Sequence, residues 1–238
     1  RVGGIFCTVA CPAPIILGFG IPVGVLLNFI FQGLAVSDPD ALSRSAINSV
    51  LVSLVAAICV VVLATVTALT VSYKKHPFLK ILTTVSATGY AFPGTVLAIG
   101  VVSFSGALDG LFAAAAQNVF GLSFDGFLIG GLALLILAYV TRFQAIGYGA
   151  LTSGVDRLSP NIMNASFVLG RGFSSSMLTL APRLLHSSMM AAGLLVFVDV
   201  MKELPMTLLL RPFNFDTLST YVYQFAKDEL LEEAALAA

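Results

Sequence analysis

Long apolar runs are the feature of this sequence that most restricts how the chain can fold. Residues 2–37 contain no charged side chain, and other apolar runs lie near 47–72, 81–106, 126–146 and 187–204. The runs are continuous and lack the period-two alternation of membrane β-strands. About 20 apolar residues in a helix cross the hydrocarbon, and a helix satisfies its own backbone hydrogen bonds there. The runs therefore predict membrane-spanning helices.

Composition excludes the main alternatives to an integral membrane protein. Hydrophobic residues make up 58% of the 238 residues and charged residues only 10%, whereas soluble domains carry about 25% charged residues. Disorder requires low hydrophobicity, so it is excluded by the same numbers. Twelve basic against twelve acidic residues give no basic field for nucleic acid, which is therefore not an expected partner. The remaining class sits in a lipid bilayer.

The expected fold is all-α, a polytopic bundle of five spans in a single transmembrane domain over residues 1–238. The spans are placed near 13–34, 47–72, 81–106, 126–146 and 187–204. We expect a kink in the third span at Pro93-Gly94, because proline interrupts helix hydrogen bonding. The apolar residues near 230–238 begin a sixth span, which we expect to be incomplete.

The distribution of basic residues predicts the orientation through the positive-inside rule. One side receives eight of the twelve basic residues, namely Arg1, Lys74, Lys75, Lys80, Arg142, Arg157, Arg171 and Arg183. The other side receives Arg44, Lys202, Arg211 and Lys227. Segments 73–80 and 147–186 are then cytoplasmic, and segments 35–46, 107–125 and 205–232 face outside.

A short helix with two marked ends is predicted within the cytoplasmic segment 147–186. Ser159 suits the N-cap, Pro160 the first helical position, and Gly170 the residue just past the end. A helix over 160–169 is too short to span a bilayer. Spacing places three of its residues on one stripe, Ile162, Ser166 and Leu169. The helix either rests on its own bundle or lays this stripe into a groove on a partner.

The same segment resembles the EAA loop of ABC importer permeases, which docks in a cleft of the ATPase subunit. The residues that carry the resemblance are Asn164-Ala165-Ser166, Gly170 and Leu180-Ala181-Pro182. Asn164 stands where this family usually has Glu, and Ser166 stands where it has its second Ala. The resemblance implies that Asn164, Ala165, Ser166 and Gly170 couple the chain to an ATPase.

A second stretch, Lys202-Glu203-Leu204-Pro205, resembles the permeases of iron(III) ABC importers more specifically. Those permeases are often long chains of two homologous halves, and residues 1–238 resemble the second half without its last helix. The resemblance implies a type I importer permease, multi-pass in the bacterial inner membrane. It also implies three protein partners, which are an ABC ATPase dimer, an external (periplasmic) solute-binding protein, and a second permease half or second copy.

The resemblance also implies that the chain is not an enzyme. It contains no Gly-Lys-Ser or Gly-Lys-Thr, hence no P-loop, so ATP and Mg are expected on the partner ATPase. We expect no catalytic residue, no metal site and no cofactor bound by this chain.

The charges near the end of the last full span mark a possible pathway or gate, since intramembrane charges are costly and usually functional. The residues concerned are Asp199, Lys202, Glu203 and Pro205. Asp199 can also pair with Lys202 at i+3, and a structural ion pair at the interface is the alternative.

Two other functions stay open. One is a type I permease for another solute, such as molybdate, sulfate, thiamine or a polyamine. The other is a secondary transporter or channel subunit that works without an ATPase.

Overall fold

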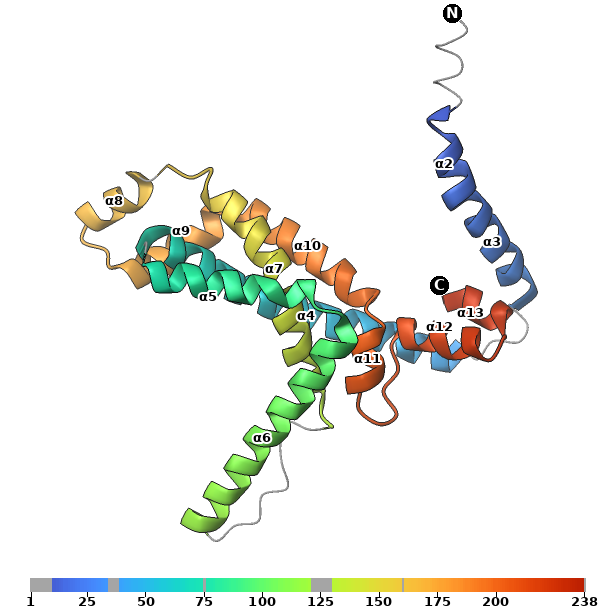
Figure 1. Ribbon diagram of the computed structural model, residues 1–238. Coiled ribbons are helices and arrows are strands. Elements are labelled where there is room, and N and C mark those ends of the chain that lie inside the picture. The colour runs from blue at the N-terminus through green and yellow to red at the C-terminus, as the bar shows by residue number, and fades with distance from the viewer. Residues whose placement is uncertain (1–9, 34–38, 75, 121–129, 160, 238) are drawn as a thin grey trace, which may run out of the picture. The chain divides into compact units, whose positions relative to one another are not determined.

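The computed structural model describes residues 10–33, 39–74, 76–120, 130–159 and 161–237 (Figure 1). All of the regular structure in these ranges is helical, with no strand among the described residues. The predicted all-α class is therefore confirmed. Two compact units are formed, one from residues 1–48 and 216–238 and the other from residues 49–215.

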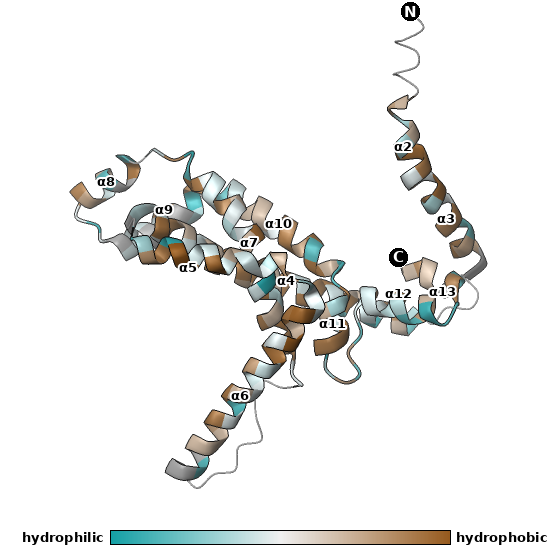
Figure 2. Ribbon diagram, viewed as in Figure 1, coloured by the Kyte–Doolittle hydropathy of each residue, from teal (hydrophilic) through white to brown (hydrophobic). Residues whose placement is uncertain are grey.

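In the described part of the chain, four helical segments are long and apolar enough to cross a membrane. They are Ala13–Phe31, Pro39–Tyr73, Gly94–Ala115 and Leu132–Val155. The first is built from α2 (Ala13–Ile15), a π-helical turn (Ile16–Gly20) and α3 (Ile21–Gly33), and the others from α4 (Pro39–Lys74), α6 (Gly94–Phe120) and α7 (Leu132–Val155). The fifth predicted span forms the shorter apolar helix α10 (His186–Met201). Figure 2 shows hydrophobic residues along α3 and α6.

The third span differs from the prediction, because the chain breaks at Pro93 instead of kinking. The helix α5 (Pro77–Ala87) and a 3₁₀ turn (Thr88–Ala91) end at Phe92, which is extended with φ −78° and ψ 142°. Proline disfavours the helical region for the residue before it, which explains the break. The membrane-length helix is α6, so the described residues 107–115, predicted to face outside, belong to an apolar span.

The fourth span also differs from the prediction. Its helix α7 runs from Leu132 to Val155 instead of 126–146, and residues 126–129 lie outside the described part of the chain. Residues 147–155, predicted to begin the polar loop, therefore extend the helix. Arg142, which was expected to mark the cytoplasmic end, lies near the middle of α7. Likewise α4 begins at Pro39, inside the segment predicted as an external loop.

The smaller unit combines α3 with two C-terminal helices. α12 (Leu218–Lys227) begins with a capping box in which Thr217 and Thr220 exchange hydrogen bonds, and α13 (Leu231–Ala237) packs against α3 and α12. Ala234 and Ala235 are buried. Such small residues allow helices in lipid to approach closely, where van der Waals packing drives association.

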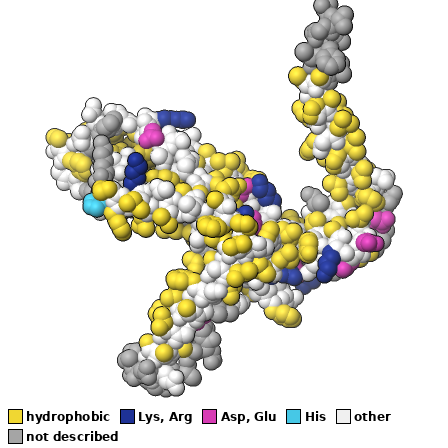
Figure 3. Space-filling view, viewed as in Figure 1, with side chains coloured by type: hydrophobic (Ala, Val, Ile, Leu, Met, Phe, Trp, Pro, Cys, Tyr) yellow, Lys and Arg dark blue, Asp and Glu magenta, His cyan; other side chains and the backbone are white. Residues whose placement is uncertain are grey.

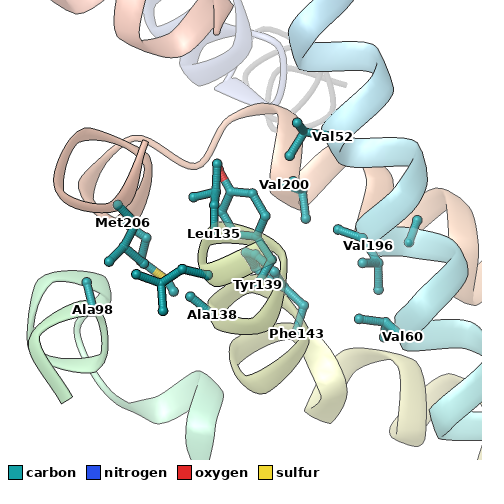
Figure 4. Close-up of a cluster of buried hydrophobic side chains, with 14 residues drawn as sticks. Val52, Val60, Ala98, Leu135, Ala138, Tyr139, Phe143, Val196, Val200 and Met206 are labelled. Atoms are coloured by element: carbon teal, nitrogen blue, oxygen red, sulfur yellow. The ribbon is translucent and has the colours of Figure 1, made fainter. Parts of the chain in front are cut away.

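The larger unit is organised around α7, whose apolar face meets α4, α6, α10 and α11 (Pro205–Leu210). Figure 4 shows Tyr139 and Leu135 of α7 among Val60, Val196 and Met206. A methyl group added at Gly147 would come within 2.7 Å of Val60 Cγ1. Close packing therefore depends on small residues of α7.

The outer surface of this unit is apolar as well. Leu54, Ile58, Val62 and Leu194 are among many exposed hydrophobic side chains of α4 and α10. Figure 3 shows hydrophobic side chains gathered over the visible face. Soluble monomers rarely expose apolar area on this scale, so the surface fits contact with lipid or with other membrane helices.

A candidate coupling loop and a buried ion pair

The short loop helix is α8, formed by Asn161–Val168. The Ser159 hydroxyl accepts a hydrogen bond from the backbone N–H of Asn161 at 3.4 Å, so the predicted N-terminal residue stands in its capping place. Pro160 lies outside the described residues. The helix is followed by α9 (Phe173–Leu184), which contains Pro182.

Gly170 ends α8 in the way the sequence predicted. Its φ is +76°, a left-handed conformation that glycine adopts without strain. The N–H of Gly170 bonds the carbonyl of Phe167 at 2.9 Å, and the N–H of Arg171 bonds the carbonyl of Ser166 at 3.1 Å. These two bonds make a Schellman motif, which satisfies the free carbonyls at the helix end.

A pair of hydroxyl groups fastens α8 to α9. The Oγ atoms of Ser166 and Ser176 are 2.5 Å apart, and both residues are buried. Ser176 donates its hydrogen to the carbonyl of Gly172 at 3.0 Å. Since a serine has one hydroxyl hydrogen, Ser166 must be the donor to Ser176.

The predicted coupling residues differ in their exposure. Asn164, Ala165 and Gly170 are exposed, whereas Ser166 is buried against α9. The predicted stripe of Ile162, Ser166 and Leu169 is not evenly exposed, because Ser166 is buried whereas Leu169, directly after α8, is 80% exposed.

Sequence reasoning placed Leu169 on the predicted docking stripe but did not single out the exposed apolar end of α8 as a whole. Phe167, Val168 and Leu169 form a consecutive apolar tip, with Val168 86% exposed. The turn at Gly170 reverses the chain directly after them, so α9 does not cover them. The signal was present in the sequence as three apolar residues immediately before a terminating glycine.

An ion pair lies inside the larger unit, where α7 meets the residues between α10 and α11. Arg142 Nη1 is 3.4 Å from Glu203 Oε1, and their side chains are only 17% and 9% exposed. The basic-residue count placed Arg142 on the cytoplasmic side and Lys202, the neighbour of Glu203, on the outer side, and this contact shows that the two assignments are incompatible. Arg142 was taken as the end of its apolar run because it is charged, but its charge is paired with Glu203 inside the larger unit.

The start of α6 closes over this ion pair. A methyl group added at Gly94 would lie 2.7 Å from Glu203 Oε1, 3.1 Å from Met206 Cγ, and in collision with the Arg142 guanidinium. Only glycine leaves room at this point. The N-terminus of α6 also carries positive partial charge, which favours the nearby carboxylate.

Glu203 and Pro205 together begin α11. Pro205 occupies its first turn, where a missing N–H is tolerated, and the Glu203 carboxylate accepts from Met206 N at 3.5 Å. Thr207 Oγ1 donates to the carbonyl of Glu203 at 2.5 Å. The Tyr139 hydroxyl, 2.5 Å from Thr207 Oγ1, must therefore donate to Thr207.

Asp199 and Lys202 form a separate pair. Lys202 Nζ is 2.6 Å from Asp199 Oδ1 at i+3 spacing, and the Lys202 side chain is 70% exposed. The predicted i+3 pairing is confirmed. Adjacent residues 202 and 203 thus belong to two different ion pairs, one exposed and one buried.

Among the residues described, no group of three or more His, Cys, Asp or Glu side chains is arranged to hold a metal ion. Cys11 and Cys59 are free thiols.

Comparison with known proteins gives one informative match. No protein-family profile matches the chain. The Fe(3+)-transport system permease protein FbpB 2 of Haemophilus influenzae is 26% identical over 225 residues, which is 90% of this chain and 40% of that protein. The match confirms the resemblance to iron(III) permeases seen at residues 202–205. The chain spans well under half the length of this relative.

Proposed function

We propose that this chain is a transmembrane permease subunit of an ATP-driven ABC importer, and that it moves iron(III) delivered by an external binding protein. The apolar tip at Phe167, Val168 and Leu169 is the observation that carries the proposal, together with the named function of the relative. A permease that hydrolyses no ATP needs a contact that transmits work from a separate ATPase. ATP and Mg are then bound by that ATPase.

The geometry of the loop suits such a contact. α8 has 8 residues, so it is about 12 Å long and cannot cross about 30 Å of hydrocarbon. Its exposed apolar end can enter a groove on a partner. Asn164, Ala165 and Gly170 would form the surrounding contact surface, and Ser166 would hold α8 to α9.

The ion pair and its neighbours are proposed as the gate. Glu203 and Pro205 stand where the chain breaks between α10 and α11, and Glu203 is bound to α7 through Arg142. A movement of α11 away from α7 would lengthen this contact. Asp199 lies one turn before Glu203 in α10, and Lys202 directly precedes Glu203 with its side chain exposed, and this pair would meet the incoming solute.

The exposed apolar faces of the helices need partners outside the chain. The apolar outer faces are proposed to lie against the bacterial inner membrane and against a second permease half or a second copy. An ATPase dimer would engage one loop on each half, so the pathway would lie between two related bundles.

Reconstitution tests the proposal. The chain with its ATPase, partner half and binding protein is placed in liposomes, and uptake of radiolabelled iron(III) is followed with and without ATP. Uptake that needs no ATP would point to a secondary transporter. ATP-dependent uptake of another solute, but not of iron(III), would show that the substrate is that solute.

Substitutions at the apolar tip test the contact with the ATPase separately from transport. We expect Val168→Asp to abolish solute-stimulated ATP hydrolysis, because a charge at the tip cannot enter an apolar groove. Ser174→Asp is the matched control, since Ser174 is exposed in the same loop but lies in α9. Equal ATP hydrolysis in both variants would contradict docking through the tip.

A further inference from the structure

A groove lies between α4 and α10 on the outer surface of the larger unit, and its volume is about 570 Å³. Among the described residues that line it, only His186 has a polar side chain. His186 begins α10 at the place where α9 leads into that helix (Figure 1). The groove is therefore an apolar channel with one polar end, and that end adjoins the coupling loop.

The groove has a floor of small side chains and walls of large ones. In the floor Ala57 is buried, and a methyl group added at Gly193 would lie 3.6 Å from Val61 Cγ2. The walls are aliphatic side chains that are each more than half exposed, namely Ile58, Val62, Met190 and Leu194. Transmembrane helices pack closely where small residues let their backbones approach, and walls of this size would hold another helix away. A thin, flexible chain can lie between them.

The length of the groove matches one leaflet of a bilayer. On α10 its lining runs from His186 to Phe197, a rise of about 16 Å. The hydrocarbon core is about 30 Å thick, so one leaflet contributes about 15 Å. An acyl chain that starts at the polar end would therefore reach about to the midplane of the bilayer within the groove.

The polar end of the groove is basic. Arg183 is exposed and lies between two lining residues, Pro182 and His186. The Nδ1 atom of His186 is 3.1 Å from the Arg183 carbonyl. Since a carbonyl can only accept, His186 donates and holds this part of the chain beside the groove. No acid in the described part of the chain forms an ion pair with Arg183, so its guanidinium is available to an anionic group.

We propose that this groove binds an anionic phospholipid from the leaflet on the side of α8 and α9. One acyl chain lies between α4 and α10, and the phosphate meets the Arg183 guanidinium, because basic groups beside clefts between membrane helices recognise anionic headgroups. Pro182 and Arg183 belong to α9, so the lipid contacts both the bundle and the segment that follows the coupling helix. This inference goes beyond the proposed function and does not depend on the transported solute.

The first experiment counts the lipids bound to the full chain by native mass spectrometry. Phosphatidylglycerol, which is anionic, is compared with phosphatidylcholine, which is zwitterionic and carries the same acyl chains. We expect one phosphatidylglycerol per chain, bound about fivefold more tightly than phosphatidylcholine, which is the size of one basic contact near a membrane surface. A chain that retains no lipid, or one that binds both lipids equally, would overturn the proposal.

The second experiment removes the headgroup contact. Arg183→Gln should weaken phosphatidylglycerol binding about fivefold and leave phosphatidylcholine binding unchanged. Lys80→Gln is the matched control, because Lys80 is exposed on α5 and lies outside the groove. Equal binding of phosphatidylglycerol by the two variants would refute the contact with Arg183.

The third experiment fills the groove. Gly193→Leu should weaken the binding of both lipids at least about tenfold, because its side chain occupies the place of several acyl methylene groups. Gly100→Leu, in α6 with nothing within 4 Å, should bind lipid as the wild type does. If Gly193→Leu instead dissociated a dimer and kept its lipid, the groove would belong to a second copy and the proposal would fall.

A fourth measurement uses the wild-type chain and so does not depend on the folding of a variant. Phosphatidylglycerol with a photoreactive group in its acyl chain, added at one lipid per chain, should label peptides that contain residues 54–62 and 186–197. Labels spread evenly over the exposed apolar helices would overturn the assignment to the groove. None of these measurements uses iron or ATP, so their failure would leave the proposed function intact, and a chain that binds lipid but transports no iron would refute only that function.

Discussion

The coupling loop and the Arg142–Glu203 junction, the place where the start of α6 closes over this ion pair, depend on similar local features. They differ in the kind of side chain that they expose or bury. Each depends on a glycine and on a hydroxyl hydrogen bond between helices. Gly170 has open space around it and a left-handed φ, whereas Gly94 is needed because charged side chains fill the space beside it. The loop exposes apolar side chains, and the junction buries charged ones.

This contrast shows where local hydropathy is a poor guide to position. Hydropathy alone would place an apolar residue inside and a charged one at the surface, yet Val168 is exposed and Glu203 is buried. Both exceptions have the same physical cause, namely a partner. Glu203 has its partner within the chain, and Val168 is proposed to find one outside it.

Breaking the buried pair should have the largest effect. Glu203→Leu leaves the Arg142 charge buried without a partner, and we expect a loss of about 3–5 kcal/mol of stability, measured by thermal unfolding in detergent. Adding Arg142→Leu should recover most of the loss, since an apolar pair of similar size replaces the ions. Lys202→Gln, at the exposed pair, should change the unfolding temperature far less. Equal losses for Glu203→Leu and Lys202→Gln would show that burial does not distinguish the pairs.

Crowding the junction should have the next largest effect. Gly94→Ala adds a methyl group against Glu203 and Arg142, and overpacking of this kind costs about 1–3 kcal/mol. Gly100→Ala, in the same helix with nothing within 4 Å, is the control and should be neutral or slightly stabilising. Equal unfolding temperatures for the two variants would show that the side chains beside Gly94 can move to make room for the methyl group.

The smallest effect on stability is expected at the loop. Gly170→Ala forces an ordinary residue into a left-handed conformation, at a cost of about 1–2 kcal/mol confined to α8 and its turn. Stimulated ATP hydrolysis should fall while the unfolding temperature of the bundle stays unchanged. Gly172→Ala lies two residues on, without a left-handed φ, and should behave as wild type. Loss of coupling in both variants would remove the special role of Gly170.

Sequence reasoning succeeded where the signal is local. Capping residues and glycine placed α8 within a residue or two, and i+3 spacing gave the Asp199–Lys202 pair. Apolar runs gave the all-helical class. The break at Pro93 was predicted only as a kink, because the sequence does not show whether one helix continues through a proline or two separate helices form.

The missed features depend on contacts between distant residues. No periodic pattern links Arg142 with Glu203, or Gln144 with Thr67, because each pair is brought together by the packing of separate helices. The crowding at Gly94 has the same origin. Such features need the arrangement of helices, which one sequence does not specify.

The length of α4 has a consequence for the lipid around it. Its 36 residues make a helix of about 54 Å, against a hydrocarbon thickness of about 30 Å. Holding all of it within the hydrocarbon would need a tilt of about 55°, beyond the roughly 40° seen in membrane proteins. The first turns, with Asp40 and Arg44, must therefore stand among the headgroups or beyond them. Acyl-chain length then sets how much of this helix lies within the hydrocarbon.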